Sequence, residues 1–148
     1  MIQKLQAILF TCSILLSAAQ VAAQPPVNVN GTAYAVGGYD VVAYFTDGAA
    51  VRGSKDYAAS YRGATWLFRS ADHKARFEKS PTAYLPAYLG YCAYGAAQQK
   101  LVRVDPEAFT IYKGKLYLNY SLDVRREWLA NADGFIQRAD KYFSTLEH

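Results

Sequence analysis

The stretch YAASYRGATWLF, residues 57–68, decides the fold, because two aromatic-rich runs flank an Arg62-Gly63 pair. Aromatic residues favour strands, and a glycine between two such runs favours a hairpin turn. Alternate residues from Tyr57 to Tyr61 share one side of the first strand, whereas Trp66 and Phe68 share another. The stretch therefore predicts a β-hairpin that turns at Arg62-Gly63.

A second hairpin is predicted downstream, with strands at 109–112 and 115–119 joined at Lys113-Gly114. Between the hairpins, residues 92–99 are rich in alanine, which predicts a short helix. The chain thus mixes hairpins and helices, and no internal repeat is evident. This pattern predicts a single compact α+β domain in which two β-hairpins pack with several short helices.

Each hairpin is followed by a serine that starts a helix. Ser70 precedes a helical stretch that ends before Pro81, and Ser121 precedes one that runs to about Ala130. A serine in this position accepts a hydrogen bond from the first helical turn. Asp133 is the predicted cap of the last helix. That helix has a regular apolar face: Phe135, Ala139, Tyr142, Phe143 and Leu146.

Residues 1–23 have the composition of an export signal. Lys4 gives a positive start, residues 7–16 are apolar, and Val21 and Ala23 fit the small-x-small rule for cleavage. The apolar run is shorter than the roughly 20 residues that a membrane-spanning helix needs. We therefore expect a periplasmic or secreted protein with no membrane span after cleavage.

Cleavage removes 23 of the 148 residues and Cys12 with them. We expect 24–33 to be a mobile lead-in and 34–148 to be one domain. The basic residues are scattered rather than clustered among stacking aromatic residues, which argues against a nucleic-acid partner. Cys92 then has no partner for an internal disulfide. It remains a core thiol, a metal ligand, a reactive thiol or an intermolecular partner.

Two polar side chains are predicted to point inward. His73 lies four residues before Phe77, so both share one helix face, and the ring nitrogens of His73 need partners. His73 is either a core histidine bonded to a tyrosine or a carbonyl, or a ligand-binding residue. Asp40 follows Tyr39 in an opening motif that is rich in glycine. Its first predicted role is to cap a helix, and its second is to contribute to a site.

Cys92 lies among tyrosines and glycines in the stretch LGYCAYGA, residues 89–96. If Cys92 starts a helix, the free backbone N–H groups favour its thiolate. Tyr91 and Tyr94 would form the walls of such a site. The alternative is a small buried residue, which is common for a free cysteine.

Five motifs occur in this order: Gly38-Tyr-Asp-Val-Val-Ala-Tyr-Phe, Tyr61-x-Gly63-x-x-Trp66-x-Phe68, Phe77-x-x-x-Pro81-x-x-Tyr84, Gly90-Tyr-Cys-Ala and Gly114-Lys-Leu-Tyr-Leu-Asn119. Together they resemble exported bacterial YHS-domain proteins over roughly 34–143. The resemblance implies a YHS-type domain with a core similar to treble-clef-like domains that bind zinc or copper. In the metal-associated members, one cysteine follows the strand-ending Phe and a second comes four residues later. The corresponding positions here hold Arg69 and His73.

The resemblance, together with the donor chemistry of a thiolate and an imidazole, predicts a non-catalytic binding module with His73 and Cys92 as metal ligands. The expected ligand is a copper or zinc ion, with copper ahead of zinc, or a small molecule. We expect four further residues to line the pocket: Tyr39, Asp40, Tyr91 and Tyr94. One alternative is a thiol-based redox protein that uses Cys92. The other is a structural or interaction domain in which Cys92 is buried and inert.

Overall fold

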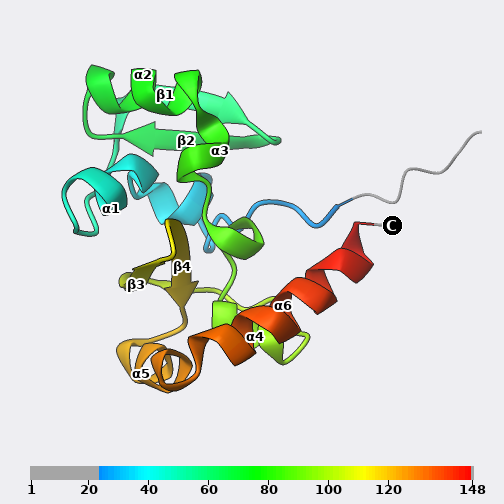
Figure 1. Ribbon diagram of the computed structural model, residues 1–148. Helices are drawn as coiled ribbons and strands as arrows, with labels where there is room; N and C mark the ends of the chain where they lie inside the picture. The colour runs from blue at the N-terminus through cyan, green and yellow to red at the C-terminus, as the bar shows by residue number, and fades with distance from the viewer. Residues whose placement is uncertain (1–23, 148) are drawn as a thin grey trace, which may run out of the picture.

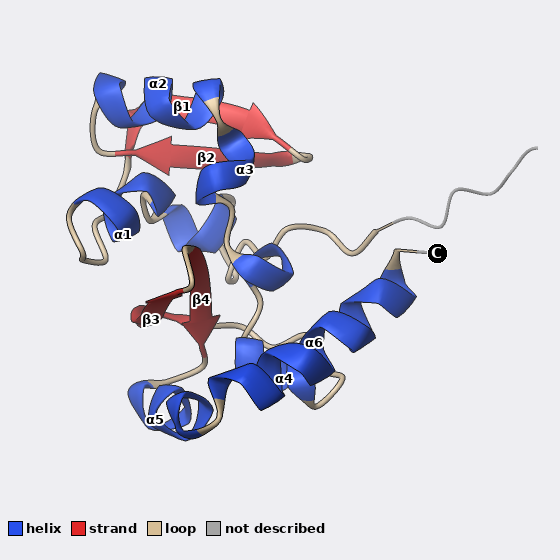
Figure 2. Cartoon of the chain, viewed as in Figure 1, coloured by secondary structure: helices blue, strands red, loops and turns tan. Residues whose placement is uncertain are grey.

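Two β-hairpins and six α-helices form the part of the chain that a computed structural model describes, residues 24–147 (Figures 1 and 2). Each hairpin is a separate two-stranded antiparallel sheet. The predicted α+β class, with two hairpins and short helices, is confirmed. The predicted export signal lies outside the described residues. Within 24–147, no helix has both the length and the apolar character needed to cross a membrane.

The elements divide into two successive sets. The first set is η1 (Ala35–Gly38), α1 (Val41–Thr46), β1 (Ser54–Tyr61), β2 (Ala64–Phe68), α2 (Ala71–Lys79) and α3 (Pro81–Tyr84). The second set is η2 (Ala87–Gly90), α4 (Ala93–Ala97), β3 (Asp105–Tyr112), β4 (Lys115–Asn119), α5 (Leu122–Ala130) and α6 (Ala132–Leu146). Figure 1 shows β1, β2 and α2 at one end of the molecule, α4, α5 and α6 at the other, and the second hairpin between them.

The first hairpin turns at Arg62-Gly63, as the sequence predicts, because both residues adopt the left-handed conformation that a tight hairpin turn requires. Ala59 pairs directly with Trp66 across the two strands. Directly opposite residues project to the same face of a sheet. The side chains of Ala59 and Trp66 therefore share one face, and the predicted assignment of the two strands to different sides was wrong.

The two predicted serine caps are confirmed. Ser70 Oγ accepts a hydrogen bond of 3.1 Å from the His73 backbone N–H at the start of α2. Ser121 Oγ accepts an equivalent bond of 3.1 Å from the Val124 N–H at the start of α5. Each bond satisfies one of the N–H groups that a helix leaves free in its first turn.

The predicted cap of the last helix was wrong. Asn131, rather than Asp133, caps α6, and its Oδ1 accepts from the Gly134 N–H at 3.2 Å. Asp133 instead accepts hydrogen bonds from the Tyr112 hydroxyl and the Lys113 ammonium. The helix starts two residues earlier than predicted because α5 and α6 meet at Asn131, which ends one helix and caps the next.

The two sets of elements are structural repeats of one unit, which the sequence analysis did not detect. Each unit runs through a 3₁₀ turn, a short helix, a hairpin and a nine-residue helix. The capping residues Asp40 and Cys92 are 52 positions apart, and Ser70 and Ser121 are 51 positions apart. We call residues 35–84 the first unit and residues 87–146 the second unit.

The repeat extends to backbone detail. The glycine before each capping site has a positive φ, 83° at Gly38 and 85° at Gly90, a conformation that side chains other than glycine rarely adopt. The N–H of Asp40 donates to the carbonyl of Val51 at 2.8 Å. The N–H of Cys92 donates to the carbonyl of Val102 at 2.9 Å. Both first strands also carry a register shift, between 54 and 58 and between 105 and 109.

The predicted mobile lead-in, 24–33, is anchored from Val27 onward. Val27 and Asn28 are buried, and Asn28 Nδ2 donates to the Gly90 carbonyl at 2.9 Å. Asn30 bonds the backbone of Val104 through both atoms of its side-chain amide. Polar composition did not reveal that asparagine amides tie the segment to the second unit.

Each unit has a buried aromatic residue at the same place in its nine-residue helix, which is α2 in the first unit and α5 in the second. Phe77 of α2 packs on Trp66 and Phe68, with ring centroids 5.4 and 5.0 Å apart. Trp128 of α5 packs on Tyr117 at 5.0 Å. Burial of one such side chain contributes about 1.5–3 kcal/mol. The helices are thereby fixed on their hairpins, which sets the positions of His73 and Val124 one turn earlier.

Candidate functional site

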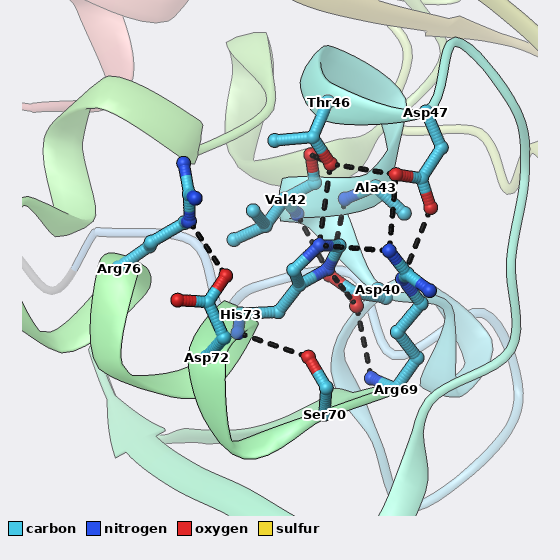
Figure 3. Close-up of polar contacts among 10 residues, drawn as sticks. All are labelled: Asp40, Val42, Ala43, Thr46, Asp47, Arg69, Ser70, Asp72, His73 and Arg76. Atoms are coloured by element: carbon cyan, nitrogen blue, oxygen red, sulfur yellow. Dashed lines mark hydrogen bonds and ion pairs between the residues drawn. The ribbon is translucent and has the colours of Figure 1, made fainter.

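Asp40 is the centre of a buried polar network in the first unit (Figure 3). Its side chain is fully buried, and Oδ1 accepts from the backbone N–H groups of Val42 at 2.9 Å and Ala43 at 3.2 Å. Oδ2 accepts from the Arg69 backbone N–H at 2.9 Å and lies 2.7 Å from His73 Nδ1. The predicted capping role is confirmed, and four donors surround one carboxylate.

His73 occupies the space between α2 and α1, and its side chain is 4% exposed. A carboxylate only accepts hydrogen bonds, so Nδ1 carries the proton that is donated to Asp40. Nε2 lies 3.3 Å from Thr46 Oγ1 and 3.4 Å from Arg69 Nη2. A guanidinium has no acceptor, so Nε2 accepts in its contact with Arg69. The imidazole is therefore held by partners on both nitrogens.

Arg69 closes this network at the surface. Its side chain is half-exposed, and its Nε forms an ion pair of 3.0 Å with Asp47 Oδ2. Figure 3 shows the guanidinium between Asp47 and the His73 ring. In this arrangement each nitrogen of the His73 ring has a hydrogen-bond partner. The network fits a structural tie between α1 and α2 better than a binding site.

Cys92 occupies in the second unit the position that Asp40 has in the first. Its sulfur accepts from the Gly95 backbone N–H at 3.4 Å and lies 3.6 Å from Asn119 Oδ1. Burial raises the pKa of the Cys92 thiol, and hydrogen bonds from the backbone of Gly95, Tyr120 and Tyr94 oppose that rise. The Gly95 N–H thus takes the place that the Ala43 N–H has in the first unit, and burial keeps the thiol protonated near neutral pH.

A cavity of about 310 Å³ opens beside Cys92. Its lining combines the thiol with aromatic, small apolar and exposed polar residues. The lining residues are Cys92, Tyr94, Gly95, Gln98, Lys100, Val102, Tyr120 and Val124. Such a mixture of an apolar wall and a few polar groups is typical of small-molecule sites.

This cavity is the counterpart of the Asp40–His73 network. Val124 is the third residue of α5, as His73 is of α2, and both follow a serine cap. A valine side chain is smaller than an imidazole and does not reach the capping residue as His73 does. Space that is filled by a side chain in the first unit is therefore open in the second.

Asn119 is a second buried polar residue next to Cys92, and sequence analysis did not select it as a site residue. Asn119 is fully buried, and its Oδ1 accepts from the Tyr94 N–H at 3.1 Å. Among residues 24–147, its Nδ2 has no hydrogen-bond partner. A buried amide donor without a partner costs about 1–3 kcal/mol. The predictive signal was its place at the end of β4, in the motif that closes with Asn119.

A larger depression, of about 500 Å³, lies elsewhere, between the segment after α3 and the C-terminal helix. It carries charges of both signs, from Lys113, Lys115, Asp140 and Glu147. Tyr88 at its edge already donates its hydroxyl to Asp140 at 3.0 Å. The Cys92 cavity is the better candidate site, because a thiol lines it together with aromatic and small apolar side chains.

The six predicted site residues fall into two groups. Asp40 and His73 are brought together in the first unit, and Cys92 and Tyr94 in the second. Tyr39 lies under the Arg52 guanidinium, whose carbon is 4.9 Å from the ring centroid. Tyr91 is the equivalent residue of the second unit; it is partly buried, which raises the pKa of its hydroxyl. Neither Tyr39 nor Tyr91 lines the Cys92 cavity.

The structure does not bring together His73 and Cys92, the two predicted metal ligands. His73 lies in α2 and Cys92 caps α4, and these two helices lie at opposite ends of the molecule (Figure 1). Within the described residues the two side chains share no hydrogen-bond partner, and no group of three His, Cys, Asp or Glu residues is placed to hold a metal ion. A thiolate and an imidazole held this far apart do not fit one copper or zinc ion.

Comparisons with known proteins leave the family of the chain open. No family model, no curated protein and no solved structure matches it. The resemblance to YHS-domain proteins therefore stays a prediction that rests on the motifs in the sequence.

Proposed function

We propose that the protein is an exported, periplasmic or secreted, YHS-type binding module that holds a small molecule in the Cys92 cavity. The observation that carries the proposal is the cavity itself, of about 310 Å³, with Cys92 and Val124 on facing elements. Small-molecule pockets are commonly about 300–1,000 Å³. The cavity is thus at the small end of this range and suits a ligand of one or two rings.

The lining supports binding rather than catalysis. Tyr94 and Tyr120 offer aromatic surface, and the exposed side chains of Gln98 and Lys100 offer polar contacts. His73 is bonded to Asp40 in the other unit. A ligand in the cavity would therefore meet a thiol and aromatic surface without an imidazole to activate it.

A screen of small aromatic probes tests this function. We expect phenol and indole to cause saturable shifts in the amide resonances of Gly95, Val102 and Val124. Val124→Phe fills the cavity and should abolish the shifts, whereas Leu129→Phe places the same side chain on the exposed face of α5 and should leave them unchanged. Absence of saturable shifts for phenol, indole and every other small ring probe, imidazole included, would reject the proposal.

Metal titrations complete this test of the proposed function. Because His73 and Cys92 lie apart, we expect that no Cu(I) or Zn(II) binding requires both residues. Titration of the unmodified protein, His73→Ala and Cys92→Ser measures this directly. Tight binding that is lost in each variant alone would restore the predicted shared metal site.

Thiol chemistry at Cys92 is the second candidate function. The observation in its favour is the backbone N–H cradle around the sulfur, which in the first unit holds a carboxylate. Burial opposes it by raising the pKa of the thiol. We expect iodoacetamide to react with Cys92 much more slowly in the folded than in the unfolded protein at pH 7.5. A rate that equals or exceeds that of free cysteine would favour redox chemistry over binding.

A further inference from the structure

The repeat makes the Asp40–His73 network a template for what the Cys92 cavity binds. This inference rests on the proposed function, since it names the class of ligand for the same cavity. Six residues of the network have counterparts in the cavity lining. In the order first unit to second unit, they are Asp40 and Cys92, Val42 and Tyr94, Ala43 and Gly95, Thr46 and Gln98, Arg69 and Tyr120, and His73 and Val124.

In the first unit, one imidazole ring fills the space between these residues. Its Nδ1–H donates to the capping residue Asp40, and its Nε2 faces Thr46 and Arg69 (Figure 3). The ring thus bridges the N-cap of α1 and the polar end of the same helix. The dimensions of this space are set by backbone that the second unit repeats.

In the second unit, the polar groups at both ends of that space remain, and the ring is missing. The Cys92 sulfur takes the place of the carboxylate and can accept a hydrogen bond through its lone pairs. Gln98 takes the place of Thr46 and offers a side-chain amide at the opposite end. Tyr120, which replaces Arg69, adds an aromatic surface against which a flat ring can stack.

We propose that the Cys92 cavity binds a small planar nitrogen heterocycle of the imidazole class, which occupies in the second unit the place of the His73 ring in the first. One ring N–H donates to the Cys92 sulfur, and the second ring nitrogen faces Gln98. The volume of about 310 Å³ is larger than an imidazole ring, so a substituted ring also fits.

Titration with imidazole at about pH 8, where the ring is mostly neutral, tests the proposal. We expect saturable shifts of the amide resonances of Gly95, Val102 and Val124. 1-Methylimidazole keeps the ring but has no N–H donor, and we expect it to bind about fivefold more weakly, which is the loss of one hydrogen bond of about 1 kcal/mol. Equal affinities for the two probes would overturn the proposed orientation and with it the inference.

Val124→His supplies the ring from within the chain and mimics the first unit. We expect this variant to fold and to lose imidazole binding by at least tenfold. Should Val124→His fail to fold, Val124→Phe fills the same space without polar atoms and should give the same loss. Unchanged imidazole binding in a folded variant of either kind would overturn the inference, because the ring would then lie elsewhere.

His73→Val is the matched control, since it opens the equivalent space in the first unit. We expect imidazole to raise the thermal stability of this variant more than that of the unmodified protein, because the free ring replaces the missing side chain at Asp40. The two proposals fail differently. If phenol or indole binds and imidazole does not, the ligand class is wrong and the binding function stands. If none of these probes binds, both fall.

Discussion

The two capping sites have the same backbone and opposite interiors. In the first unit, Asp40 and His73 fill the space between α1 and α2. In the second, Cys92 and Val124 leave a cavity of about 310 Å³ at the equivalent place. The comparison teaches that a few side chains, rather than the fold, decide whether this unit forms a filled structural tie or an open cavity.

The difference follows from charge. A buried carboxylate is tolerated only when donors surround it, so Asp40 requires the imidazole of His73 and three backbone N–H groups. A neutral thiol has no such requirement, and the second unit keeps its fold without a histidine. Because Cys92 is neutral, the second unit does not require a ring at the position of Val124.

Asp40→Ala is expected to have the largest effect of the variants that test this comparison. It removes the helix cap and leaves His73 Nδ1 and the Arg69 N–H without their acceptor. We expect a loss of about 3–5 kcal/mol in the free energy of unfolding, as for other broken buried pairs. Urea denaturation measures the loss. Asp47→Ala removes the partly exposed ion pair with Arg69 and an exposed hydrogen bond from Thr46 Oγ1; it is the control and should cost about 1 kcal/mol or less.

A double-mutant cycle converts the second site into the first. Cys92→Asp alone buries a carboxylate without an imidazole partner and should destabilise the protein by about 2–4 kcal/mol. Adding Val124→His should restore about 1–3 kcal/mol, because the two residues then recreate the Asp40–His73 bond. The free energies of unfolding of the two single variants and the double variant give the coupling. Strict additivity would show that the two sites are not equivalent.

Local patterns predicted most of the elements. The hairpin turns follow from Arg62-Gly63 and Lys113-Gly114, whose left-handed conformations glycine allows at its own position. The serine caps follow from the need to satisfy free N–H groups at helix starts, and the capping role of Asp40 follows for the same reason. These features depend on neighbours within a few positions, which is the range that sequence patterns report.

The repeat and the placement of the site residues depend on contacts between residues that are far apart in the sequence. The two units share only short identities, such as Gly-Tyr before Asp40 and Cys92, and Val-Arg at 51–52 and 102–103. The core residues differ between the units, so the repeat left little trace in the sequence. Spacing showed that His73 faces inward but not which element it meets. For this reason the sequence did not reveal that His73 meets Asp40 rather than Cys92.

Ser70→Ala and Ser121→Ala sharpen the comparison by testing whether equivalent caps contribute equally. Each variant loses one hydrogen bond of 3.1 Å to the third residue of its helix. We expect each to cost about 1 kcal/mol, and the two values to agree within about 0.5 kcal/mol. Thermal and urea denaturation of both variants provide the measurement. A cost confined to one serine would show that the units differ in stability as well as in their interiors.

The smallest expected effect concerns the charge state of Cys92. Burial raises the pKa of this thiol above the value of about 8.5 for an unfolded chain. The stability that the buried neutral thiol contributes is therefore complete below that pH and is lost as the pH rises through the folded pKa. At pH 9 the loss is at most about 0.8 kcal/mol, because the unfolded thiol is then largely ionised.

Comparison with Cys92→Ala isolates this effect. Burial also raises the pKa values of tyrosines such as Tyr44 and Tyr88, but these tyrosines titrate alike in both proteins. Between pH 7 and pH 9, the free energy of unfolding of the unmodified protein should fall relative to that of Cys92→Ala. A shift in the opposite direction would mean that the N–H cradle favours the thiolate in the folded state. The second site would then be an anion cradle like the first, and thiol chemistry, rather than binding alone, would become the better account of Cys92.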